Sequence, residues 1–239
     1  MLNNLYATRL VLSLFHHENT ALNSLDVAVA IRTNLGDIFT RNPIILPDNA
    51  PPEIPRVIFQ SEDGFTVSVS QSRTDFTFEL KSETHCDHAL EQFVSVANKL
   101  TSAVLSGFGI SINRIAFMLF SRLNLSDNGV EFIQDLYLNR DKLQDISGAE
   151  THWLVCPIIS GEEINRWVRV KSVSNEQGVS ENSVDVLVDT NTKVNPERNY
   201  TLEEAACFIE SCYQDLRSNM YDILRFDWGE KHEQFRRLQ

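Results

Sequence analysis

Two stretches of the chain carry the strongest signal for its architecture: Thr8-Arg-Leu-Val-Leu-Ser-Leu-Phe-His-His-Glu-Asn19 and Asn113-Arg-Ile-Ala-Phe-Met-Leu-Phe-Ser-Arg-Leu-Asn124. They lie 105 residues apart, and four of the twelve aligned positions are identical. The identical pairs are Arg9/Arg114, Leu14/Leu119, Phe15/Phe120 and Asn19/Asn124. Both stretches are apolar on alternate and on intervening positions, which is typical of strands buried on both faces at the centre of a sheet.

The segments that follow these two stretches repeat the same order of elements. In the first half the spacing predicts a strand over 7–16, a helix over 26–38, strands over 56–60, 65–71 and 76–80, and a helix over 87–105. In the second half it predicts a strand over 112–123, a helix over 129–139, strands over 152–160, 164–174 and 184–189, and a helix to about 225. The last helix opens with the capping box Thr201-Leu-Glu-Glu204.

The sequence therefore predicts an α+β fold of two β-α-β-β-β-α pseudo-repeats, residues 1–107 and residues 108–239 with the C-terminal tail, in one compact unit. Helices joined to an antiparallel sheet in this order cover one of its faces. We expect the repeats to share one twisted, eight-stranded antiparallel sheet with helices on one face. The helix-free face would be covered by the proline-rich segment 42–55 or by a second chain.

Composition limits the classes of function. The 239 residues are 42% hydrophobic and 23% charged, as in ordinary globular proteins, and carry a net charge of -12. A chain this acidic without a Lys/Arg-rich run repels phosphate backbones and anionic lipid, so we expect neither direct nucleic-acid binding nor membrane binding. The apolar run Leu10–Phe15 is far shorter than the roughly 20 residues that span a bilayer. We expect a cytoplasmic protein.

Motifs for catalysis, cofactors or metals are weak. The chain has no GxSxG, GxxxxGK[ST] or GxGxxG pattern, and its four cysteines form no CxxC pair. His85 and His88 would share a helical face if the helix began early enough, with Cys86 or Asp87 as a third metal ligand. The simpler interpretation is a polar helix entrance. We therefore expect no cofactor, no metal and no catalytic residue.

Five residues are candidates for contacts with a partner. Arg9 and Arg114 occupy equivalent positions in the two predicted repeats, where they either pack structurally or mark a pseudo-symmetric polar site. The C-terminal tail carries Phe226, Trp228 and Phe235 among mixed charges, a composition typical of interface anchors. The alternative for the tail is packing on its own domain.

Three stretches resemble an uncharacterised bacterial family of about this length that is distributed sporadically across genomes. They are Pro55-Arg-Val-Ile-Phe-Gln-Ser-Glu-Asp-Gly64 with Phe76-Thr-Phe78, the strand Ile112-Asn-Arg-Ile115, and the closing helix from Leu202 to Ile223. The resemblance covers the middle and end of the chain and brings no catalytic residues. Sporadic distribution implies toxin–antitoxin or phage-defence gene neighbourhoods.

Together these observations favour a non-catalytic, protein-binding accessory subunit, such as the antitoxin-like or regulatory component of such a system. Its acidic surface would suit a basic effector, and a homo-oligomer is the other expected assembly. The alternative is an enzyme or small-molecule sensor with its site on the open sheet face or between the repeats.

Overall fold

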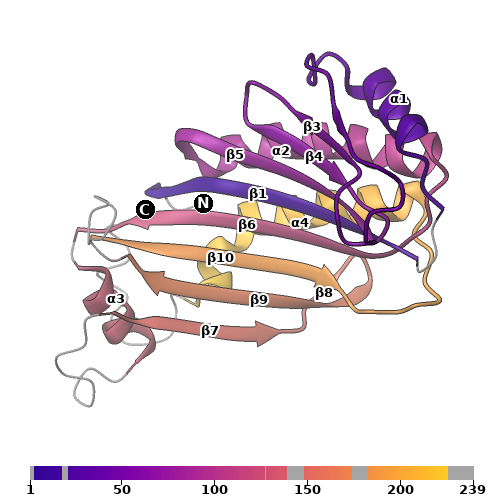
Figure 1. The fold of residues 1–239 in the computed structure, drawn as a ribbon. Helices are drawn as coiled ribbons and strands as arrows, with labels where there is room; N and C mark the ends of the chain where they lie inside the picture. The colour runs from indigo at the N-terminus through magenta and orange to yellow at the C-terminus, as the bar shows by residue number, and fades with distance from the viewer. Residues whose placement is uncertain (1–2, 18–20, 127, 139–147, 174–181, 226–239) are drawn as a thin grey trace.

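A computed structural model shows a mixed α+β structure, in which the described part of the chain forms one large antiparallel sheet and four α-helices (Figure 1). The structure describes residues 3–17, 21–126, 128–138, 148–173 and 182–225. None of the helices within these ranges is long and apolar enough to cross a membrane.

The first half of the chain contains seven elements and a terminal π-turn. They are β1 (Leu5–His16), α1 (Ser24–Leu35), β2 (Ile44–Ile45), β3 (Val57–Gln60), β4 (Phe65–Val69), β5 (Arg73–His85), α2 (Cys86–Ser102) and η1 (Ala103–Gly107). The second half contains β6 (Ile112–Asn124), α3 (Gly129–Tyr137), β7 (Glu150–Val155), β8 (Ile158–Ile159), β9 (Glu162–Ser172), β10 (Ser183–Thr192) and α4 (Leu202–Ile223).

The two stretches with which the sequence analysis began form the middle of the sheet. The strand order is β2-β3-β4-β5-β1-β6-β10-β9-β7, and β8 pairs with β9 beside this path. Strands β1 and β6 pair with each other, with Leu12 opposite Phe117, Arg9 opposite Phe120 and Phe15 opposite Arg114. The prediction that both strands are central is confirmed.

The core lies between the sheet and the helices. Side chains alternate along the strands, so that Leu10, Leu12 and Leu14 of β1 are fully buried on the face that carries α2. Figure 1 shows α2 and α4 lying behind the sheet, side by side. Phe93 of α2 stacks on Phe76 of β5 at 4.9 Å between ring centres and meets Phe117 of β6 edge-on at 5.5 Å. These rings tie α2 to β5 and β6, the two strands on either side of β1.

Several predicted element boundaries and the strand count were wrong. The sheet has ten strands rather than eight, because two isoleucine pairs, Ile44–Ile45 and Ile158–Ile159, add short strands. Strand β5 continues to His85, five residues beyond its predicted end, since its later residues pair with the start of β1. Helix α2 ends in a π-turn at Gly107. The capping box of α4 is confirmed, with reciprocal bonds between Thr201 and Glu204.

The proline-rich segment packs at one end of the sheet. Its backbone carbonyls at Ala50 and Pro52 accept hydrogen bonds from the Arg56 guanidinium and from the Ser72 amide. Arg56 is 5% exposed and also donates to Gln71. These bonds fasten the segment to the turn between β4 and β5.

A buried ion pair joins the sheet to α4. Arg166 of β9 points to the helix side, is 4% exposed, and donates to Thr190 of β10 at 3.1 Å and to the carboxylate of Asp215. Asp215 in turn accepts a hydrogen bond from Asn219, where the backbone of α4 leaves helical geometry. The Arg166 guanidinium thus has both an opposite charge, on Asp215, and a further hydrogen-bond acceptor, on Thr190. A charge is tolerated in the interior only when it is paired and hydrogen-bonded in this way.

We expect Asp215→Ala to lower the free energy of unfolding by about 2–3 kcal/mol, because it leaves the Arg166 charge buried without its partner. Urea denaturation measures this change. The matched control is Glu150→Ala, which breaks the solvent-exposed pair with Arg169 and should cost less than about 1 kcal/mol. Equal effects of the two variants would contradict a structural role of the buried pair.

Candidate functional site

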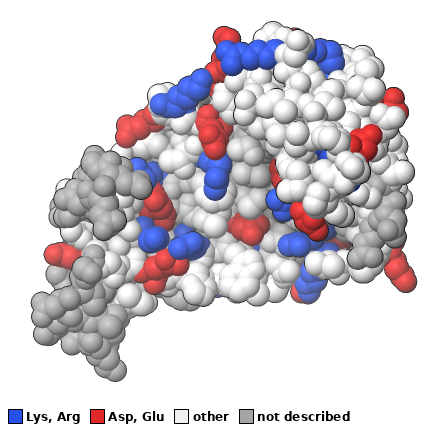
Figure 2. Space-filling view, in the orientation of Figure 1, with Lys and Arg blue, Asp and Glu red and all other residues white. Residues whose placement is uncertain are grey.

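The face of the sheet turned away from the helices, here called the open face, presents a mixture of polar, aromatic and aliphatic side chains. On β1 these are the half-buried Arg9, Val11 and Phe15 and the buried Ser13, which alternate with the buried leucines. The opposing residues on β6 are Phe120, Met118, Ala116 and Arg114. Figures 1 and 2 view this face, and Figure 2 shows positive and negative side chains interspersed across it.

Both arginines predicted as partner contacts lie on the open face, each over an aromatic ring of the neighbouring strand. The guanidinium carbon of Arg9 is 3.8 Å from the centre of the Phe120 ring, and that of Arg114 is 4.8 Å from the centre of Phe15. The Nε atom of each arginine is buried without a hydrogen-bond partner among the described residues. Cation–π stacking of this kind stabilises by roughly 0.5–2 kcal/mol, depending on desolvation.

A chain of polar contacts extends from Arg114 across β10. Its Nη2 donates to the Asn191 side chain at 2.9 Å, and the Asn191 amide donates to the carboxylate of Asp189 at 3.1 Å. Burial raises the pKa of Asp189, against the opposing effects of the Asn191 hydrogen bond and the Arg114 charge. The cluster therefore offers a stacked guanidinium beside a carboxyl group that binds a proton more readily than an exposed one.

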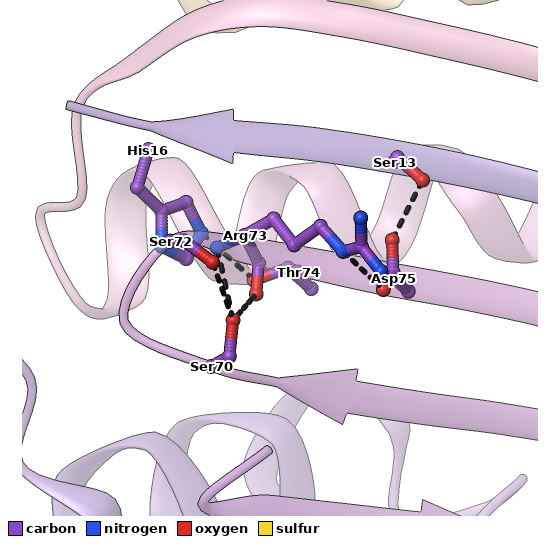
Figure 3. A network of polar contacts seen from close by, with 7 residues as sticks. All are labelled: Ser13, His16, Ser70, Ser72, Arg73, Thr74 and Asp75. Carbon is purple, nitrogen blue, oxygen red and sulfur yellow. Dashed lines mark hydrogen bonds and ion pairs between the residues drawn. The ribbon is translucent and has the colours of Figure 1, made fainter. Parts of the chain in front are cut away.

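On the other side of β1, β5 carries a second polar chain (Figure 3). Ser13 donates to Asp75 at 2.6 Å, and the Nε of Arg73 donates to the other Asp75 oxygen at 2.8 Å. Back on the β6 side, the pair between Arg122 of β6 and Asp185 of β10 at 2.9 Å continues the pattern. Much of the charge on the open face is thus matched within the chain.

A buried histidine lies at the end of the same two strands, on the helix side of the sheet (Figure 3). The His16 ring makes hydrogen bonds through Nδ1 to the Gln71 carbonyl at 3.1 Å and through Nε2 to the Thr74 hydroxyl at 3.0 Å. Burial lowers the pKa of His16 to about 4, although the Gln71 carbonyl and the Asp75 charge oppose the shift. In the sequence His16 is the last residue of a predicted strand and the first of two adjacent histidines, and neither feature signals a buried, hydrogen-bonded ring.

A shallow pocket opens where β1 bulges. The register of β1 against β5 and β6 shifts between Ala7 and Arg9, which leaves Thr8 exposed. Thr8, Lys81 and Arg122 line part of the pocket. Lys81 already donates to the Glu62 carbonyl and Arg122 to Asp185, so the pocket gathers cations that have partners within the chain.

The candidate metal ligands are not brought together. His85 ends β5 and precedes α2, so it does not share a helical face with His88 as the early-helix interpretation required. The His85 Nδ1 lies 3.7 Å from Asp87, while exposed His88 bonds to Gln92 at 3.1 Å. The described residues contain no group of three or more His, Cys, Asp or Glu side chains able to hold a metal ion. The tail candidates Phe226, Trp228 and Phe235 lie outside the described residues.

Charge is distributed unequally between the two layers. The four helices carry three basic residues, Arg32, Lys99 and Arg217, against ten acidic ones. The acidic residues are Asp26, Asp87, Glu91, Glu131, Asp135, Glu203, Glu204, Glu210, Asp215 and Asp222. The strands carry eight acidic and eight basic residues. Much of the net negative charge of the protein therefore lies on its helix layer.

Comparison with known proteins finds a solved structure of low similarity. No family model and no curated protein matches the chain. Among solved structures, a rolling circle replication initiator protein from Geobacillus stearothermophilus is similar at a TM-score of 0.36 and 10% sequence identity. The similarity covers 93% of this chain and 84% of that one, and at this TM-score it carries no argument about fold or function.

We expect the neutral His16 to make stability depend on pH. Its pKa is lowered from 6.5 to about 4 in the folded protein, so its contribution is intact above pH 6.5 and is lost as the pH falls toward 4. The loss approaches about 3 kcal/mol once the pH is below 4. Chemical denaturation at several pH values measures it.

The matched variant is His16→Asn, which keeps a polar side chain but does not titrate. The difference in unfolding free energy between the parent protein and this variant should shrink with acidification. The remaining titratable groups contribute the same pH dependence to both proteins, so their contributions cancel in the difference. A constant difference from pH 7 to about pH 4 would show that His16 is not held neutral.

Proposed function

We propose that this protein is a non-catalytic accessory subunit that binds another protein, and that its acidic helix layer engages a basic partner. The observation that carries the proposal is the segregation of charge: the helices carry ten acids and three bases against a balanced sheet, and of these acids Asp215 is neutralised by Arg166 inside the protein. A surface of one sign attracts a partner of the opposite sign and accelerates its association. The antitoxin-like or regulatory setting proposed with it rests on the family resemblance alone.

The outer positions of the long helices provide the contact groups. Glu91 of α2 and Glu203 and Glu210 of α4 are exposed, and the two helices pack against each other through their buried residues. The three carboxylates therefore lie on two neighbouring helices. Lysine and arginine side chains of a partner would meet them directly.

We further propose that Arg9 and Arg114 contact a partner from the open face. Stacking on Phe120 and Phe15 holds each guanidinium plane in place, and the side chain of Arg9 makes no ion pair or hydrogen bond with another described residue. A guanidinium that is already ordered loses less side-chain entropy when it binds a carboxylate. The helix layer remains the primary surface.

The two halves of the chain are proposed to be pseudo-repeats that arose by duplication. Leu12 faces Phe117, its equivalent at a shift of 105, so a two-fold axis at this pair would exchange the Arg9–Phe120 and Arg114–Phe15 stacks. The reciprocal stacks support the proposal. An experimental structure should superpose residues 5–107 on residues 112–223 about this axis, and dissimilar halves would refute it.

We expect the triple variant Glu91→Lys, Glu203→Lys, Glu210→Lys to weaken partner capture by about tenfold or more, because it places like charges against a basic surface. The tagged full-length chain, expressed at native level in its host, would be purified and its stoichiometric partner quantified. Salt should weaken the parent complex as well.

The matched control is Glu53→Lys, Asp63→Lys, Glu79→Lys, which changes the net charge equally at exposed positions outside the helices. It should leave capture nearly unchanged. Equal losses for both triples, or a partner that is itself acidic, would refute the proposed surface. The double variant Arg9→Met, Arg114→Met tests the open face separately, and unchanged capture would remove these arginines from the interface.

A further inference from the structure

A groove, here called the α1 groove, runs along α1 beside the turn that ends α2. Its volume is about 460 Å³, within the roughly 300–1,000 Å³ of typical binding pockets. One wall is formed by Val27, Val29 and Ala30 of α1, and the other includes Phe108 and Ile110. Helix α1 packs against α2 and η1, and Figure 1 shows it at the end of α2. The α1 groove therefore belongs to the helix layer, which carries the excess of acid.

Exposed apolar side chains border the α1 groove, and its two walls meet in direct contact. Leu25 and Val29 lie four residues apart on α1 and are 65% and 66% exposed, more than any other large apolar side chain on the described helices. At the base, a Cβ added to Gly107 would lie 3.2 Å from the Ala30 Cβ. Apolar surface beside a preformed hollow is typical of a place where an anchor side chain of a partner binds.

The charges around the α1 groove are negative and lack basic partners. Asp26 carries the one formal charge among the described residues that line the groove, and its carboxylate makes no hydrogen bond or ion pair with another described residue. Asp48 lies beside the same helical turn, where it accepts hydrogen bonds from the hydroxyl and the amide of Ser24. Arg32, the one base of α1, donates instead to carbonyls that follow the helix.

An anion would find these helix N–H groups already occupied. The first N–H groups of a helix otherwise lack partners and attract anions. The Asn23 side chain accepts hydrogen bonds from the Leu25 and Asp26 amides. The Ser24 amide donates to Asp48. Because these donors are bound and two carboxylates lie at this end of α1, a cation is the charge that the α1 groove favours.

The α1 groove adjoins the acidic surface proposed to engage the partner. The Tyr200 amide donates to the Ile112 carbonyl at 2.9 Å, which places the start of α4 next to the segment that leads out of the groove wall. Leu202, 36% exposed, and the exposed Glu203 follow directly. Figure 1 shows α1 and the start of α4 at the same end of the sheet. A partner bound in the groove would therefore have further carboxylates nearby.

We propose that the α1 groove receives an apolar side chain of the partner, and that a neighbouring lysine or arginine of the partner pairs with Asp26. This assignment rests on the proposed accessory function and names the chemistry that the partner must present. The apolar side chain leaves water, and the cation meets a carboxylate that has no partner to displace. A second copy of this chain is a poor occupant, because it would bring a net charge of -12 to an acidic surface.

Two synthetic helical peptides test the site directly. One carries leucines four residues apart flanked by lysines, and in the other glutamates replace the lysines. Each is titrated into the methyl-labelled full-length protein while the methyl signals of Val27, Val29 and Ile110 are followed by NMR. The lysine peptide should shift these signals and the glutamate peptide should not. No shift with the lysine peptide, equal shifts with both peptides, or shifts caused by protein concentration alone would overturn the proposal.

Variants of the groove should weaken binding of the lysine peptide. We expect a loss of about tenfold or more for Val29→Lys, which places a like charge on the apolar rim. Asp26→Asn, which keeps the shape of the side chain, should cost about fivefold, as for an exposed ion pair. The matched control is Ser95→Lys, an exposed position of α2 that does not line the groove. Equal losses for Val29→Lys and Ser95→Lys would refute the site.

The capture experiment on the acidic layer separates the groove from the function on which it rests. Val29→Lys should reduce capture of the basic partner, whereas Ser95→Lys should retain it. Equal capture by the parent chain and by Val29→Lys would remove the groove from the interface and leave the accessory function standing. A host that yields no basic partner for the parent chain would refute the accessory function, and with it the assignment of the groove to that partner.

Discussion

The pairing of β1 with β6 is the interaction on which the rest of the structure depends. It joins the two halves of the chain, and its helix-side residues form the floor of the core. Leu10, Leu12 and Leu14 on one strand and Phe117 and Leu119 on the other are fully buried. Each buried side chain of this size contributes about 1.5–3 kcal/mol. Helix α2 packs on this floor and α4 packs beside α2, so disruption of the central pair would remove the support of both long helices.

The sequence predicted the central strands and the long helices because their signals are local. Alternation of leucines in β1, and the reciprocal Thr201–Glu204 cap of α4, act within a few residues. The end of β5 was missed since pairing with β1, and no local residue preference, extends it to His85. Short strands such as β2 form only because a neighbouring strand is already present.

The buried polar residues could not be predicted in the same way. Arg166 lies in the inward phase of β9, in line with Ile164, Val168 and Val170, where the pattern predicts an apolar side chain. Only the nearby Asp215 of α4, 49 positions later, explains a buried arginine there. His16 likewise depends on Gln71 and Thr74, whose distance in sequence hides the contact. Such sites need a partner from a distant element, so the candidate polar site emerges from tertiary structure rather than from spacing.

The charge distribution and the sheet edges follow from one constraint. Helices that cover one face leave the strands with a water-exposed face, where charges stack on rings or pair with neighbours, as Arg9 and Arg73 do. The helices carry ten acidic residues but only three basic ones, so net negative charge accumulates on the helix layer. At its margins the same sheet must either end in a blunted strand or remain open to pairing. Strand β2, two residues long between Pro43 and Pro47, takes the first course, whereas no strand among the described residues pairs with the outer edge of β7.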